Sequence, residues 1–172
     1  MPRPLTGEPL ALDLVDTIWI DQGQDFDQFD EPDGLESWLT EHALPVPPEG
    51  PEVVRAHLTT ARDAVRTALE QGDERPLNAV LAHGSRRPLL RDGEPAAEVV
   101  VDDPAWTPAW IAAADLVRLL GERRERVRKC ANPACVLWFY DLTKNGSRRW
   151  CSMAVCGNRT KTARFQQSHR RP

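Results

Sequence analysis

Apolar residues between positions 52 and 71 recur every three or four residues, as they do along one face of an α-helix. Pro51 precedes this stretch and Gly72 follows it, and both residue types commonly mark helix ends. We therefore expect an amphipathic helix over residues 52–71 that covers a core with its apolar side. That side consists of Val54, Leu58, Ala61, Val65 and Ala68.

Weaker patterns predict two short helices and a hairpin around this long helix. The short helices are expected over residues 35–43 and 77–83. Residues 87–94 and 97–101 are rich in strand-forming types and flank an Asp-Gly dipeptide, which is typical of a hairpin turn.

The first 36 residues are harder to interpret. Residues 9–19 form a short apolar segment in which periodicity does not separate helix from strand, and we favour a helix. Residues 21–36 contain seven acidic residues and no basic one, which indicates a solvated loop leading into the next helix.

A further helix is predicted to follow Thr107 and Pro108, which suit an N-cap and a first helical position. Its apolar stripe ends near Leu120, and four arginines follow before residue 129. We expect the helix to run towards Arg128, so that residues 121–129 form a basic helical connector.

Charge divides sharply along the chain. The formal net charge is −4. Residues 121–172 hold 13 Lys or Arg against three acidic residues, a charge of +10, whereas residues 1–120 hold 9 basic and 23 acidic residues, a charge of −14. A strongly basic end on an acidic body suggests a polyanionic partner for that end.

All four cysteines lie in the basic end as two Cys-x4-Cys pairs separated by 15 residues. Two close pairs brought together by a loop are what a tetrahedral four-sulfur zinc site requires. Two disulfides or ordinary buried thiols are the alternatives, and a reducing compartment disfavours the disulfides. Four protein ligands leave no open position, so one structural Zn²⁺ is expected. The ligands are Cys130, Cys135, Cys151 and Cys156.

Between the cysteine pairs, residues 136–141 and 148–150 are predicted to form a hairpin with a turn at Asn145-Gly146, and a helix is predicted over 152–169. This order is treble-clef-like. The overall prediction is an α+β chain: a mostly helical N-terminal domain with a β-hairpin (residues 1–120), the connector, and a small C-terminal zinc finger (residues 130–172).

Cationic residues of the predicted finger are the candidates for binding nucleic acid. Three of them share one face of the predicted last helix, and three others lie near the cysteines, where they can serve either sulfur or phosphate. A solvated basic surface without a partner is the alternative. The candidates are Lys161, Arg164 and Arg171 on the helix, and Arg148, Arg149 and Arg159 near the cysteines.

A resemblance to the CGNR zinc fingers is carried by RRWCSM at residues 148–153 and CGNR at residues 156–159. LALDLVDT at residues 10–17 is similar to the opening of the ABATE domain that usually precedes such a finger. Asp16 stands where that opening usually has Asn. The resemblance spans nearly the whole chain and implies four zinc-binding cysteines and a bacterial, stress-linked transcription regulator that binds DNA through the finger.

No catalytic motif is evident, so an enzyme is disfavoured. A carboxylate pair at Asp13 and Asp16 lacks an evident partner base, and the histidines are scattered. Other hypotheses remain: the N-terminal domain binds a small-molecule effector, the finger contacts protein or RNA with its zinc purely structural, or the acidic segment 21–36 masks the basic face.

The location is expected to be cytoplasmic, because no secretion signal or membrane-spanning run is visible. Dimerisation of the helical body would let the protein read two DNA half-sites, but no heptad seam is visible, so the sequence leaves the oligomeric state open.

Overall fold

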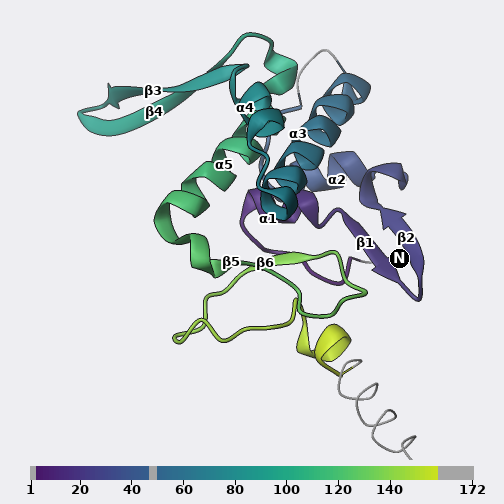
Figure 1. The fold of residues 1–172 in the computed structure, drawn as a ribbon. Coiled ribbons are helices and arrows are strands. Elements are labelled where there is room, and N and C mark those ends of the chain that lie inside the picture. The colour runs from purple at the N-terminus through teal and green to yellow at the C-terminus, as the bar shows by residue number, and fades with distance from the viewer. Residues whose placement is uncertain (1–2, 47–49, 159–172) are drawn as a thin grey trace, which may run out of the picture. The chain divides into compact units, whose positions relative to one another are not determined.

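The computed structural model describes residues 3–46 and 50–158 (Figure 1). The chain divides into two compact units. One unit combines Met1–Gln28 with Leu119–Pro172, and the other is Phe29–Arg118. The first 28 residues therefore belong to the same unit as the cysteine-rich end. None of the helices in the described part of the chain combines the length and apolar composition that crossing a bilayer requires.

Helices dominate the Phe29–Arg118 unit. The predicted long helix is confirmed as α3, which ends at a left-handed Gly72 (φ 70°) and buries the expected apolar face. Both predicted short helices are present, and the helix predicted after Thr107 begins at that residue. The helices are α2 (Gly34–Glu41), α3 (Pro51–Gln71), α4 (Arg75–Leu81) and α5 (Thr107–Arg123), the last of which crosses the unit boundary.

The predicted hairpin of this unit is also confirmed and is longer than expected. Strand β3 (Gly84–Arg91) pairs in antiparallel register with β4 (Glu94–Val101), and the ribbon projects from the helices of its unit (Figure 1). Asp92 and Gly93 both have positive φ, 52° and 87°, as a tight two-residue hairpin turn requires.

In the unit formed by both ends of the chain, the N-terminal part differs from the prediction. The helix α1 (Leu10–Val15) is shorter than expected, and β1 (Ile18–Asp21) pairs with β2 (Gln24–Asp27). The expectation of an acidic loop was therefore wrong for residues 21–27. Cross-strand stacking of Trp19 on Phe26, with ring centroids 5.5 Å apart, stabilises a hairpin that the acidic composition concealed.

The connector is helical only at its start. Helix α5 ends at Arg123, a 3₁₀ turn follows over Arg124–Arg126, and β5 (Val127–Lys129) completes the segment. The prediction of a helix reaching Arg128 was wrong, because residues 121–126 offer no apolar side chain to pack.

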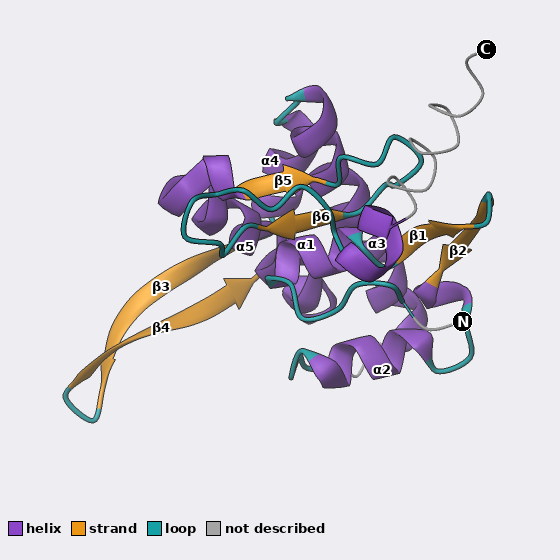
Figure 2. Ribbon diagram, turned by 90° about the horizontal axis from the view of Figure 1, so that it is seen from below, coloured by secondary structure: helices purple, strands orange, loops and turns teal. Residues whose placement is uncertain are grey.

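The strand partner inside the cysteine-rich segment was also predicted incorrectly. Strand β6 (Trp138–Tyr140) pairs with β5, which precedes the first cysteine, and residues 148–150 form no strand. Figure 2 shows β5 and β6 side by side with α1 next to them. The chain is thus α+β as predicted, with small hairpins and four clustered cysteines in its C-terminal segment.

Candidate metal centre

The four cysteine sulfurs form one cluster, and all lie within 4.8 Å of one another. The Sγ atoms of Cys135 and Cys151 are 3.8 Å apart, and those of Cys151 and Cys156 are 3.5 Å apart. Both distances exclude disulfides, which are about 2.05 Å long. A tetrahedral site with Zn–S bonds of about 2.3 Å has sulfur–sulfur edges of about 3.8 Å. The cluster therefore fits one structural zinc ion held by all four cysteines.

The first cysteine pair is shaped by a turn at Asn132. The Asn132 side-chain oxygen accepts from the Ala134 amide at 3.1 Å, and its backbone oxygen accepts from the Cys135 amide at 2.9 Å. The Asn132 side-chain amide donates to Cys156 Sγ at 3.4 Å. One residue between the ligands thus shapes one turn and connects it to the other pair.

The second pair is shaped by a π-helical turn over Met153–Gly157, which Ser152 begins. The Ser152 carbonyl accepts from the Cys156 amide at 3.0 Å, and the Cys151 amide donates to Cys130 Sγ at 3.4 Å. A helix was predicted over residues 152–169. The structure shows this π-helical turn at its start, and residues 159–169 lie outside the described residues.

Without a metal, the crowded sulfurs compete for protons. Hydrogen bonding from Cys135 lowers the pKa of Cys130 to about 2, while hydrogen bonding to Cys130 raises the pKa of Cys135 to about 12. The pKa of Cys151 is also raised, first by its hydrogen bond to Cys130. A divalent cation removes this conflict because it stabilises all four thiolates together.

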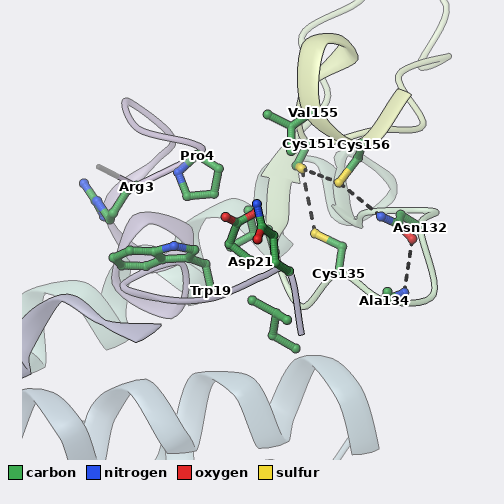
Figure 3. Close-up of a pocket in the computed structure, with 13 residues that line it drawn as sticks. Arg3, Pro4, Trp19, Asp21, Asn132, Ala134, Cys135, Cys151, Val155 and Cys156 are labelled. Atoms are coloured by element: carbon green, nitrogen blue, oxygen red, sulfur yellow. Dashed lines mark hydrogen bonds between the residues drawn. The ribbon is translucent and has the colours of Figure 1, made fainter. Parts of the chain in front are cut away.

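The cluster lies in an apolar core to which both ends of the chain contribute. Trp19 from β1 is 2% exposed and packs with Leu137, Phe139 and the cysteines. Figure 3 shows Trp19 and three of the cysteines around a cavity of about 400 Å³. The metal centre is thus built into a core that the N-terminal segment completes.

Two carboxylates of the N-terminal segment cover the free edge of β6. Asp16 Oδ1 accepts from the Trp138 amide at 2.9 Å, and Glu8 Oε2 accepts from the Tyr140 amide at 2.8 Å. These amides alternate along the strand and face away from β5, so the carboxylates act where a third strand would pair.

Asp13 and Asp16, the carboxylates weighed as a catalytic acid and base, each bind another group of the protein. Asp13 Oδ1 forms an ion pair with Arg3 Nη1 at 2.6 Å, and both side chains are almost fully buried. Asp16 is 1% exposed and holds the β6 amide. Their geometry indicates structural roles.

The structure describes only two of the six predicted nucleic-acid contacts. Arg148 donates to Glu8 Oε1 at 2.9 Å, to the Cys151 carbonyl at 2.7 Å and to the Trp150 carbonyl at 3.1 Å, which favours a structural role. Arg149 is exposed, with its guanidinium 5.5 Å from the Trp150 ring. The other four candidates lie outside the described residues; they are Arg159, Lys161, Arg164 and Arg171.

Sequence reasoning missed three charged residues that shape the finger. Asp141 is fully buried, and Arg126 and Arg128 of the supposed helical connector donate hydrogen bonds to the loop that follows β6. Their roles depend on the pairing of β5 with β6, which no local pattern indicated.

Two family models match this chain. The CGNR zinc finger matches residues 126–169, and the ABATE family, described as "putative stress-induced transcription regulator", matches residues 8–123. No curated protein matches the chain. The finger match contains all four clustered cysteines, and the ABATE match contains Glu8 and Asp16, which hold β6. Because the ABATE match covers well over half of the chain, the chain belongs to the ABATE family and carries a C-terminal CGNR zinc finger.

Proposed function

We propose that this protein is a transcription regulator that binds duplex DNA through its zinc-stabilised C-terminal module. One observation carries the proposal. Residues 126–158 hold six Lys or Arg and one acidic residue, Asp141, which is fully buried and paired with Arg128 at 3.3 Å. The described surface of the finger therefore displays cationic side chains and no carboxylate of its own. The exposed cations are Lys129, Lys144 and Arg149.

Such a surface suits the phosphate backbone of DNA. Each cation that approaches a phosphate releases condensed counterions, and this release drives binding without reading sequence. Four thiolates around Zn²⁺ carry a net charge of about −2, which only partly offsets the surrounding positive charge. Lys161, Arg164 and Arg171 extend the cationic character along the sequence.

The site suits binding better than catalysis. Four cysteine ligands leave no open metal position at which a substrate or water could be activated. The reduced thiols that zinc requires are also compatible with the cytoplasmic location that we propose.

The decisive experiment measures binding to a fluorescent DNA duplex across a salt series by anisotropy. The full zinc-loaded chain is compared with a Lys144→Ala/Arg149→Ala variant and with zinc-stripped protein. A matched control, Arg87→Ala/Arg118→Ala, removes two exposed cations from the Phe29–Arg118 unit, where each forms an ion pair with a neighbouring carboxylate.

We expect the affinity for DNA to fall as the salt concentration rises. In the Lys144/Arg149 variant, the slope of log affinity against log salt concentration should become shallower by about two units. The control variant should behave as wild type, and zinc removal should abolish binding. Absence of salt-dependent binding to duplex DNA, or equal binding by both double variants, would show that this surface serves another partner.

A second candidate, effector sensing, is favoured by the cavity of about 400 Å³ beside the cysteine cluster. Its apolar wall includes Trp19, Leu137 and Val155, and Asp21 and Asn132 supply polar groups (Figure 3). A ligand there would contact both ends of the chain within one unit. A thermal-shift screen should find compounds that stabilise the wild type and lose their effect when Ala134→Trp fills the cavity.

A further inference from the structure

The loop at residues 141–148, which we call the Asp141 loop, has an interior made of hydrogen bonds. One carboxylate oxygen of the buried Asp141 accepts from the Thr143 amide at 2.9 Å and from its hydroxyl at 2.6 Å. The other accepts from the Arg148 amide at 2.9 Å and from Arg128 at 3.3 Å. A single side chain thus connects both ends of the loop.

Two arginines hold the backbone of the same loop. Arg126 donates to the carbonyl oxygens of Asp141, at 2.9 Å, and of Thr143. Arg128 donates to the Gly146 carbonyl at 2.6 Å. Charged donors to carbonyl oxygens form stronger bonds than neutral ones, so these contacts fix the loop conformation before any partner arrives.

This fixed loop presents one apolar side chain to solvent. Leu142 is 85% exposed, more than any other large apolar side chain in residues 3–46 and 50–158. Its neighbours in the loop are exposed and polar, and Arg149 follows directly. These neighbours are Thr143, Lys144, Asn145 and Ser147.

A lone apolar tip among polar and cationic residues fits few partners. An apolar protein interface or a lipid surface would require a broader apolar patch than one leucine provides. Insertion between two stacked base pairs needs a single apolar side chain, with cations beside it for the two flanking phosphates. The Asp141 loop carries such an apolar side chain, and the sequence places the exposed cations Lys144 within the loop and Arg149 directly after it.

We propose that the Asp141 loop is a DNA wedge. Leu142 enters a base step from the minor groove, and Lys144 and Arg149 contact the phosphates on either side. The inference rests on the proposed DNA binding and adds how the duplex is deformed. Because Arg126 and Arg128 already hold the loop, they are positioning residues, and little conformational freedom is lost when the wedge inserts.

Deformation of the duplex also gives the protein a way to prefer some DNA sequences over others. Pyrimidine–purine steps such as TA unstack easily, whereas A-tracts resist bending. A wedge therefore prefers duplexes with a flexible step at the point of insertion, without any hydrogen bond to a base edge.

The test uses the full zinc-loaded chain and two duplexes of about 20 base pairs, one with central TA steps and one with an A-tract. Fluorescence energy transfer between dyes at the duplex ends reports bending, and anisotropy reports affinity. The variant is Leu142→Ser. The matched control is Leu90→Ser on the β3–β4 hairpin, a leucine that is also highly exposed, at 73%.

We expect the wild type and the Leu90 variant to bend the TA duplex and to prefer it over the A-tract. The Leu142 variant should lose the bend and about tenfold in affinity for the TA duplex, and it should keep the salt dependence and the zinc content. Salt-dependent binding without bending, or equal bending by wild type and the Leu142 variant, overturns the wedge and leaves DNA binding standing. Failure to bind either duplex overturns both proposals.

Discussion

The hydrogen bond between Asp16 and the Trp138 amide leads to a prediction about zinc affinity. The two residues are 122 positions apart, yet the bond is 2.9 Å long and buried. In the Asp16→Ala variant the β6 amide loses its acceptor inside the core that surrounds the cysteines. The Asp16→Asn variant keeps an oxygen in the same place.

The magnitude follows from the burial of this contact. A buried N–H that loses a charged acceptor costs about 2 kcal/mol, because it forfeits a charge-assisted hydrogen bond and water does not replace it. Metal binding and folding are coupled in small zinc modules, so destabilisation of the folded unit appears as weaker metal binding. A loss of about 2 kcal/mol corresponds to roughly 30-fold in the zinc dissociation constant.

Competition with a chromophoric zinc chelator at fixed pH measures this constant directly. The Asp16→Asn variant should stay within about 1 kcal/mol of wild type, since the acceptor remains. Asp115→Ala, a change in the other unit, should leave zinc affinity unaltered. If Asp16→Ala binds zinc as tightly as wild type, the finger folds around its metal without help from the first 28 residues, and the reasoning fails.

Three further outcomes are expected. Chelation of zinc should abolish the near-ultraviolet circular dichroism of the cysteine-rich unit and leave most helical signal, because α2, α3 and α4 lie in the other unit. Gly84→Ala should cost at least about 1 kcal/mol in urea unfolding, since a Cβ there would lie 2.8 Å from the Trp110 ring and 2.9 Å from the Val100 carbonyl oxygen, whereas Gly121→Ala meets no atom within 4 Å and should be neutral or stabilising. Burial opposes ionisation of Asp141, but hydrogen bonds from Thr143 and Arg148 outweigh it and hold its pKa at about 2. Stability from this carboxylate is therefore complete above about pH 5 and is lost as pH falls towards 2, so the stability difference between wild type and Asp141→Asn should shrink over that range.

Local patterns were sufficient for several parts of this protein. The long helix α3 follows from apolar spacing, and the β3–β4 turn follows from Asp92 and Gly93. The cysteine spacing indicated the metal centre, because ligands within each pair are close in sequence and a single loop joins the pairs. In each case the interactions that define the feature connect residues near one another in the chain.

Elsewhere the predictions were wrong where pairing with a distant residue or strand decides the conformation. Acidic composition suggested a loop at residues 21–27, but stacking between Trp19 and Phe26 makes a hairpin. The basic run before Cys130 suggested a helix, but its last three residues pair with β6 as a strand. Propensity and charge describe a segment alone, whereas a partner strand or ring decides its conformation.

By itself, the sequence determined the principal helices, the β3–β4 hairpin, the zinc-binding cysteines and the concentration of positive charge at one end. Only the tertiary structure decided that Glu8 and Asp16 complete the finger, that Arg148 holds an internal contact, and that Arg126 and Arg128 fix a loop with Leu142 at its surface. The physical reason is that a charged side chain has the same sequence signature in water and in a buried network, and only its folded partners distinguish the two.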